Sequence, residues 1–202
     1  RGSEAVEIYR RAQELEPADA EIGYGLAHAL LESKEFDDAV AVSDKTLELR
    51  PDDPAILTIK GVALHQLERL EEAEAILARS IVLNAEDTNS LLHLGRVRLQ
   101  QEDFQGAIKV FEQAAALAPD LATVHSQLAN VYAAKGSPET AVELCDEFLQ
   151  KNPASAAVIL VKALALRDAG RNDAADSLLG QHTLVSTQQI TAPPRYGSLE
   201  KF

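Results

Sequence analysis

Apolar residues recur at helical spacing along this chain, in stretches of about a dozen residues that short polar turns separate. In residues 86–119, Leu91, Leu94 and Val97 lie on one face of a predicted helix. After a polar turn, a second apolar stripe follows, made of Phe104, Ala107, Ile108, Phe111, Ala114 and Leu117. Pro119 ends the second helix, because the residue before a proline is disfavoured in the helical conformation. The pattern predicts two amphipathic helices joined by a short turn.

This two-helix unit repeats every 34 residues. Proline marks the end of four units, at Pro17, Pro51, Pro119 and Pro153, and Ala85 takes the remaining position. Alanine recurs at the same spacing in the second helices, at Ala5, Ala39, Ala73, Ala107, Ala141 and Ala175. A small residue recurs in the first helices, at Ala27, Gly61, Gly95, Ala129 and Ala163. Three series with one period indicate a tandem repeat.

The small residues indicate how the helices pack. Ala107 and Gly95 allow the two helices of one hairpin to approach closely, since no long side chain separates their backbones. One hairpin cannot bury both of its apolar stripes, so neighbouring hairpins must stack into a continuous core. Helix ends carry matching signals. Asp53 before Pro54 is typical of an N-terminal cap, as is Ser137 before Pro138, and Gly136 and Gly170 are typical of C-terminal caps.

The period, with its small, aromatic and proline positions, resembles the tetratricopeptide repeat family. The resemblance implies an all-α fold: a right-handed superhelical solenoid of antiparallel helix-turn-helix hairpins, about five and a half repeats long. No repeat carries the early tryptophan of that family; Gly23, Leu57, Leu91, His125 and Ile159 stand there instead. The predicted segments are a lone second helix at 4–17, full repeats at 18–51, 52–85, 86–119 and 120–153, a last repeat at 154–180 and a non-repeat segment at 181–202.

The fourth full repeat exchanges a large and a small residue. Cys145 occupies the usual aromatic position, and Phe148 occupies the small one on the same helix face. The total volume is roughly kept, which protein cores tolerate well. We therefore expect Cys145 to be a small core residue rather than a reactive thiol.

The two ends depart from the repeat. The first predicted helix, residues 4–17, has no partner helix before it, so Ala5, Ile8, Tyr9 and Ala12 should leave an apolar face uncovered. We expect further repeats or another chain to cover this face, and end-to-end self-association through residues 4–17 is one hypothesis. The start at Arg1 without methionine also favours a processed or partial chain.

Residues 181–202 lose the period, and three interpretations stay open: a disordered tail, a segment that packs on the superhelix, or a linker to another domain. The stretch 190–199 with Phe202 resembles the lead-in to a 2-oxoglutarate/iron(II) oxygenase domain that follows such repeats in some bacterial proteins. That resemblance implies an alternative function, in which this chain is the recruiting region of a larger enzyme whose catalytic domain lies beyond residue 202.

Charge narrows the class of partner. The 202 residues carry 19 Lys and Arg against 32 Asp and Glu, a formal charge of −13. Binding to duplex nucleic acid or to an anionic membrane surface needs a basic footprint, so we expect neither partner. No apolar run approaches the length of a membrane span. An acidic chain whose single cysteine excludes an internal disulfide fits the cytoplasm, although periplasmic repeat proteins share these features, so that location stays open.

Candidate catalytic residues are scarce. None of the five histidines has a carboxylate two residues later, which excludes the start of an iron(II) facial triad. His28, His65, His93 and His125 lie on predicted first helices of different repeats, an arrangement that gives little support for a zinc site. Neither a phosphate-binding loop nor a serine nucleophile elbow occurs. We predict no enzyme activity in this chain, with no cofactor and no metal.

Binding is the better-supported function. In the tetratricopeptide family the first helices line a concave groove, and this resemblance implies a protein-interaction module, a scaffold or adaptor, that binds a peptide or partner segment there. The implied groove residues are Tyr24, His28, His65, Asn89, His93, Arg96, Gln100, Thr123, Ser126, Gln127, Asn130 and Arg167. Arginine and amide groups suit peptide backbone or carboxylates. The alternative is that these residues are merely solvated.

One known mode of groove binding is not expected. The family's groove for acidic chaperone tails needs a lysine and an asparagine at set positions of one repeat. Tyr24 and His28 occupy those positions in residues 18–51, and no repeat offers the lysine. We therefore predict that the chain does not bind chaperone tails in this way.

Overall fold

The computed structural model describes residues 2–182, and within that range every regular element is an α-helix. The predicted all-α fold is confirmed. The chain divides into two compact units between Gln101 and Glu102, inside the predicted repeat 86–119. The first unit contains α1 (Gly2–Leu15), α2 (Ala20–Glu32), α3 (Phe36–Leu49), α4 (Pro54–Gln66), α5 (Leu70–Leu83) and α6 (Thr88–Gln100). The second contains α7 (Phe104–Leu117), α8 (Ala122–Ala134), α9 (Pro138–Lys151), α10 (Ala156–Asp168) and α11 (Asn172–His182).

Acidic residues begin several first helices, as the sequence indicates. The Asp53 carboxylate accepts hydrogen bonds from the backbone N–H groups of Ala55 and Ile56, and Pro54 stands in the first turn. Asp19 and Asp87 cap α2 and α6 in the same way. These bonds satisfy backbone donors that have no partner within the helix. The prediction for Ser137 is only partly right, because its side chain makes no capping bond although Pro138 starts α9.

A left-handed residue follows each first helix. Gly136 and Gly170 have φ of 87° and 75°, as expected for the glycine caps that were predicted. The equivalent residues in the other hairpins are not glycines: Lys34, Glu68 and Glu102 have φ of 63°, 60° and 62°. All five share the 34-residue period. The turn geometry is therefore the same in each hairpin, whichever residue fills it.

The small residues lie where helices meet. Ala27 and Ala39 in the first unit and Ala129 and Ala141 in the second are all fully buried. Gly61 faces Leu77 so closely that an added Cβ would lie 2.6 Å from Leu77 Cγ. The proposed reason for the small positions, close approach of the two helices of a hairpin, is confirmed at this contact.

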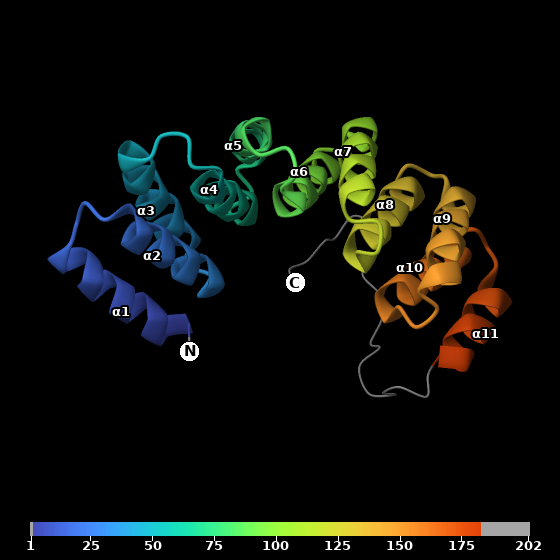
Figure 1. The fold of residues 1–202 in the computed structure, drawn as a ribbon. Coiled ribbons are helices and arrows are strands. Elements are labelled where there is room, and N and C mark those ends of the chain that lie inside the picture. Colours follow the sequence, from blue (N-terminus) through green and yellow to red (C-terminus); the bar gives the residue numbers. More distant parts are fainter. Residues whose placement is uncertain (1, 183–202) are drawn as a thin grey trace. The chain divides into compact units, whose positions relative to one another are not determined.

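Successive first helices lie side by side within each unit (Figure 1). In the first unit α2 contacts α4 and α4 contacts α6; in the second α8 contacts α10. In the first unit α3 packs against α2 and α4, and α5 packs against α4 and α6; in the second unit α9 packs against α8 and α10. In the first unit, no comparable approach joins α3 to α5 among the described residues. The first helices therefore form the tightly spaced row of that unit, and the second helices form the wider one.

The core of the second unit contains the exchanged pair. Cys145 and Phe148 are 1% and 4% exposed, and they pack with Ala129, Ala141 and Val158. Burial raises the pKa of the Cys145 thiol to about 12, so the thiolate is scarce at neutral pH. The prediction that Cys145 is a core residue is confirmed.

The first helix is only partly covered. Val6 of α1 is buried, whereas Ile8 and Leu15 are 68% and 79% exposed. Ala5 and Ala12 are half-buried, because α2 packs against this helix. The expected apolar face is therefore present: Ile8 and Tyr9 are its exposed members, and Leu15 is a further exposed apolar residue of the same helix.

At the other end, α11 continues to His182, two residues past the predicted end at Gly180. A glycine inside a helix costs free energy but does not by itself end the helix. The predictions for residues 183–202, including the oxygenase-like stretch 190–199, lie outside the described residues.

Candidate partner-binding surface

All twelve predicted groove residues lie on first helices. In the first unit, α2 carries Tyr24 and His28, α4 carries His65, and α6 carries Asn89, His93, Arg96 and Gln100. In the second unit, α8 carries Thr123, Ser126, Gln127 and Asn130, and α10 carries Arg167. The structure brings one subset together: His65 contacts His93 and Gln100, and Arg96 lies near enough to lower the pKa of both histidines.

This subset, called the histidine–arginine cluster below, forms where α4 and α6 touch. The ring centroids of His65 and His93 are 6.5 Å apart, and the rings are inclined by 73°. His65 Nε2 lies 3.1 Å from Gln100 Oε1, a hydrogen bond in which the imidazole N–H donates to the amide oxygen. The Nδ1 atoms of both histidines are buried and have no hydrogen-bond partner.

The electrostatics of the cluster follow from burial. Desolvation lowers the pKa of His93 to about 3, helped by the nearby charges of Arg96 and His65, while Asp87 acts in the opposite direction. Burial also lowers the pKa of His65, and the Gln100 bond opposes this shift. Both imidazoles are therefore neutral at pH 7. Arg96, whose own pKa burial lowers, supplies the positive charge of the cluster.

A second surface lies at the start of the chain. Residues of α1 and α2, among them Tyr9, Tyr24 and His28, line an open groove of about 740 Å³. The rings of Tyr24 and His28 lie 6.3 Å apart. Tyr9 is missing from the predicted residues because it belongs to a second helix. Gly25 leaves room for the Tyr9 ring, because an added Cβ there would lie 2.3 Å from Tyr9 Cε1.

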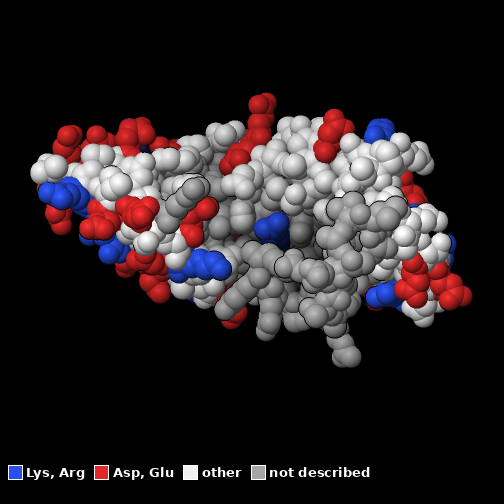
Figure 2. Space-filling view, turned by 90° about the horizontal axis from the view of Figure 1, so that it is seen from below, with Lys and Arg blue, Asp and Glu red and all other residues white. Residues whose placement is uncertain are grey.

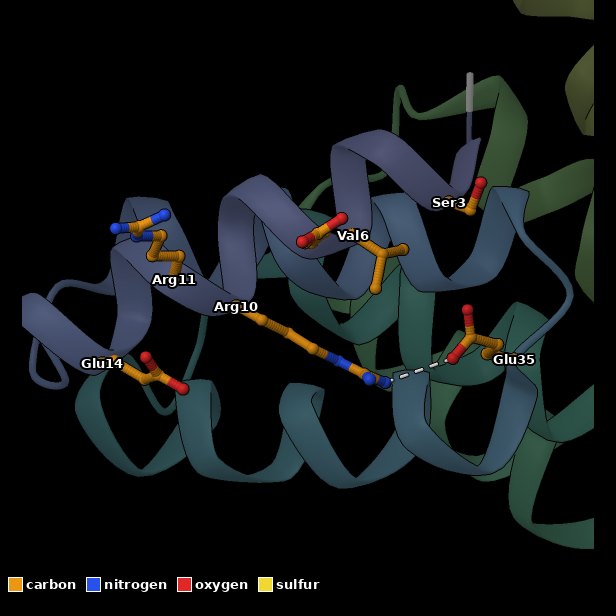
Figure 3. A pocket seen from close by; sticks show the side chains of 7 residues that line it. Ser3, Val6, Arg10, Arg11, Glu14 and Glu35 are labelled. Atoms are coloured by element: carbon orange, nitrogen blue, oxygen red, sulfur yellow. Dashed lines mark hydrogen bonds and ion pairs between the residues drawn. The ribbon is translucent and has the colours of Figure 1, made fainter.

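A hollow of about 580 Å³ beside α1 and the start of α3 has a different character (Figure 3). It is lined by Ser3, Val6, Glu7, Arg10, Arg11, Glu14 and Glu35. Arg10 extends from α1 to Glu35, at 3.1 Å, and also pairs with Asp38 at 2.6 Å. Glu35 and Asp38 already neutralise the charge of Arg10, so this arginine does not favour binding of a further anion in the hollow.

In the second unit the predicted groove residues differ from one another in exposure and in hydrogen bonding. Thr123 is exposed, whereas Ser126 is 6% exposed, and its hydroxyl has no hydrogen-bond partner. The Gln127 amide oxygen is likewise buried without a partner. Arg167 is compensated, because it donates a 2.9 Å bond to Asp176. The structure brings no charged cluster like that of α4 and α6 together from these residues.

Acidic side chains are spread over the face seen in Figure 2 rather than gathered in one place. Among residues 2–182 no helix is long and apolar enough to cross a membrane. No group of three or more His, Cys, Asp or Glu residues in that range is placed to hold a metal ion. Within the histidine–arginine cluster Arg96 is the one charged side chain, because both imidazoles are neutral.

Comparisons with known proteins agree with this architecture. BBSome complex member BBS4 from Bos taurus is 22% identical over 196 residues, which cover 97% of this chain and 37% of that protein. Anaphase-promoting complex subunit 7 from Dictyostelium discoideum is 30% identical over 118 residues, which cover 57% of this chain and 20% of that protein. The chain thus spans well under half the length of either relative.

Among solved structures, YrrB, described as a TPR protein with an unusual peptide-binding site, has a TM-score of 0.67 at 20% identity, with coverage of 88% of this chain and 92% of YrrB. A likeness at this identity shows a shared fold. Two family models, both described as tetratricopeptide repeat, match residues 1–62 and 92–156, together more than half of the chain. With its 34-residue period, its paired helices and these matches, the chain belongs to the tetratricopeptide repeat family.

Proposed function

We propose that this chain is a protein-interaction module that binds an extended segment of a partner protein along its first helices. The observation that carries the proposal is the histidine–arginine cluster on the row formed by α2, α4 and α6, where the half-buried Arg96 has no ion pair among residues 2–182. A guanidinium without a counterion can donate hydrogen bonds to oxygen atoms of a bound chain.

The names of similar proteins support the same class of function. BBS4 and anaphase-promoting complex subunit 7 are named as members of multiprotein complexes. YrrB is named for a peptide-binding site. These names describe those proteins, and for this chain they favour a scaffold or adaptor role over catalysis.

The test begins with peptides of twelve random residues displayed on phage and selected on the purified chain. Ordering a flexible peptide offsets much of its contact energy, so we expect dissociation constants on the order of micromolar. Replacing Arg96 and Asn130 with alanine should raise the dissociation constants of the selected peptides about tenfold or more, a loss of binding free energy of about 1.4 kcal/mol or more.

The matched control replaces Lys109 and Gln113, exposed residues of the second helix α7, with alanine. This control removes one positive charge and one amide, as the groove variant does. It should leave peptide affinity within about twofold, roughly 0.4 kcal/mol. Circular dichroism should be unchanged in both variants. Equal affinity of the groove variant and the natural chain would refute the proposal.

The alternative, a recruiting region ahead of an oxygenase domain, has its sequence support in residues 190–199, outside the described residues. It is compatible with partner binding, because a recruiting region also needs a binding surface. The open reading frame downstream of Phe202 tests it: a stop codon directly after this residue would exclude it.

A further inference from the structure

We propose that the open groove between α1 and α2, called the N-terminal groove below, binds one basic amphipathic helix of a partner protein, which packs there as a first helix packs elsewhere in this chain. The groove has a volume of about 740 Å³, and its lining includes Tyr9 of α1 with Ile22, Gly25 and Glu32 of α2. The inference goes beyond the proposed function, because its ligand is a helix rather than an extended segment and its surface does not include the histidine–arginine cluster.

The first argument compares α1 with the other second helices. Tyr9 of α1 is 37% exposed, whereas its equivalents in the 34-residue period, Ser43, Leu77 and Cys145, are at most 1% exposed. These three residues belong to α3, α5 and α9, each of which packs against the first helix of its own hairpin. In the first unit α1 packs only against α2, the first helix of the next hairpin. A first helix is therefore what covers this face in the other hairpins.

The second argument comes from α2. Ile22 is half-buried, whereas Ile56, Ser90 and Val158, its equivalents in α4, α6 and α10, are fully buried. Each of those three helices contacts the first helix before it, namely α2, α4 and α8. The N-terminal groove thus presents the surface that a first helix covers elsewhere, and no helix among residues 2–182 covers it.

Packing inside the first unit predicts the shape of the docked helix. Gly61 of α4 faces Leu77 of α5 so closely that an added Cβ would lie 2.6 Å from Leu77 Cγ. Tyr9 is the equivalent of Leu77, and a tyrosine is larger than a leucine. The docked helix should therefore carry a glycine opposite Tyr9 and have about the length of α4, 13 residues.

Charge predicts a further feature. His65 of α4 contacts Gln100 of α6, and Glu32 is the equivalent of Gln100 in α2. Glu32 is exposed, has no ion pair among residues 2–182 and ends α2, where the helix dipole adds negative charge. The other carboxylate of the groove, Glu21, already pairs with Arg50. A lysine or arginine of the docked helix, at the place that corresponds to His65, would face Glu32.

A second copy of this chain fits these requirements less well. Its first helices are held within their own hairpins. Its helix α11 carries Asp173 and Asp176, and no lysine or arginine occurs between Asn172 and His182. The charge of the groove therefore favours a partner with a basic helix over a second copy.

The probe is a synthetic peptide of residues 53–66, the α4 helix with its cap, in which His65→Lys supplies the basic residue and Gly61 the small one. Fluorescence anisotropy follows its binding to the full chain. We expect a dissociation constant on the order of 0.1 mM, because an isolated helix of this length is marginally stable in water. In the peptide, His65→Glu instead of His65→Lys should raise this constant about threefold or more, and adding Gly61→Leu should raise it about tenfold or more.

Charge reversal locates the site. In the chain, Glu32→Lys should reverse the preference, so that the peptide with His65→Glu binds more tightly than the peptide with His65→Lys. Glu48→Lys, the same change at an exposed residue of α3, should keep the natural preference. The chain with Arg96 and Asn130 replaced by alanine should bind the helical peptide normally, which separates this inference from the proposed function.

Three results would overturn the inference: equal binding of the two peptides that differ at residue 65, undiminished binding after Gly61→Leu, or a Glu32→Lys chain that keeps the natural preference. Loss of binding in the Arg96 and Asn130 variant would assign the peptide to the other surface and has the same effect. A dimer of the chain, seen by light scattering, that the peptide dissociates would show that a second copy fills the groove and that the choice of occupant is wrong.

Discussion

Turn residues in left-handed backbone show how single positions are constrained here. Lys34, Glu68 and Glu102 adopt the conformation that Gly136 and Gly170 adopt in other hairpins. A side chain at positive φ crowds the backbone, at a cost of roughly 1–2 kcal/mol, which the rest of the hairpin must offset. Glycine removes the crowding, although its greater freedom in the unfolded chain cancels part of the gain.

We therefore expect Glu68→Gly to raise the free energy of unfolding by up to about 1 kcal/mol. The control is Glu71→Gly, an exposed residue in the first turn of the next helix, which should lower it by roughly 0.5–1 kcal/mol. Urea unfolding followed by circular dichroism measures both. A loss of stability in Glu68→Gly similar to that of the control would contradict the role assigned to the turn.

The neutral state of His93 predicts a pH dependence of stability. Its folded pKa, about 3, lies below its ordinary value of 6.5, so between these values the unfolded chain binds a proton that the folded chain does not. His93 should therefore reduce stability as the pH falls below 6.5, by at most about 1.4 kcal/mol per pH unit, and should have no such effect above it.

Urea unfolding at pH 7.5, 6.5, 5.5 and 4.5 should show a shallower decline in His93→Gln than in the natural chain, since glutamine does not titrate in this range. Other titrating groups contribute equally to both proteins. Parallel curves for the two proteins would show that His93 is not held neutral by the fold.

At the level of single residues, the sequence predicted what local chemistry decides. Asp53 as a cap and Cys145 in the core both follow from near neighbours in the chain. The contact between His65 and His93 does not, because it depends on how α4 packs against α6. Both residues were predicted to line the groove, but the sequence does not show that their rings touch.

At the level of the helices, Gly61 fixes the separation of α4 and α5. An alanine there would place its Cβ 2.6 Å from Leu77 Cγ, and Leu77 is fully buried with no room to move away. The clash should cost about 1–3 kcal/mol, which exceeds the gain of about 1 kcal/mol that alanine brings to a helix.

Gly61→Ala should thus lower the midpoint of urea unfolding. Combining it with Leu77→Ala, which removes the opposing γ carbon, should cost less than the sum of the two single substitutions, whereas Leu77→Ala alone should be destabilising. Additive effects of the two substitutions would indicate that the residues do not restrain one another.

Helix boundaries were largely predictable, because prolines, aspartates and the small positions recur with one period. The prediction was wrong at the end of α11, where Gly180 indicated a stop and the helix continues to His182. A glycine allows a helix to end but does not require it, and neighbouring packing decides.

At the level of the whole molecule, the exposed face of α1 keeps self-association as a hypothesis. Ile8 and Leu15 are the most exposed apolar residues of that helix. If they join two copies of the chain, light scattering should show a mass that rises with concentration, and Ile8→Glu with Leu15→Glu should abolish this rise. A constant monomer mass over a wide concentration range would remove the hypothesis.

The repeat architecture was predictable because three series of residues recur every 34 positions, although the residues between them differ from repeat to repeat. The division between Gln101 and Glu102 was not, since the period continues through it without a break. Composition likewise predicted an acidic chain but not the position of Arg96, which has no ion pair among residues 2–182.

The contrast between the two rows of helices in the first unit has a mechanical consequence. The first helices are in contact along their row, whereas α3 and α5 are not, so this unit bends most easily by changing the distance between its second helices. Flexing of this unit would change the gap between α3 and α5 far more than the gap between α4 and α6. His65 and His93 would stay in register while the unit adjusts its curvature, so a segment held there could remain bound through shape changes around it.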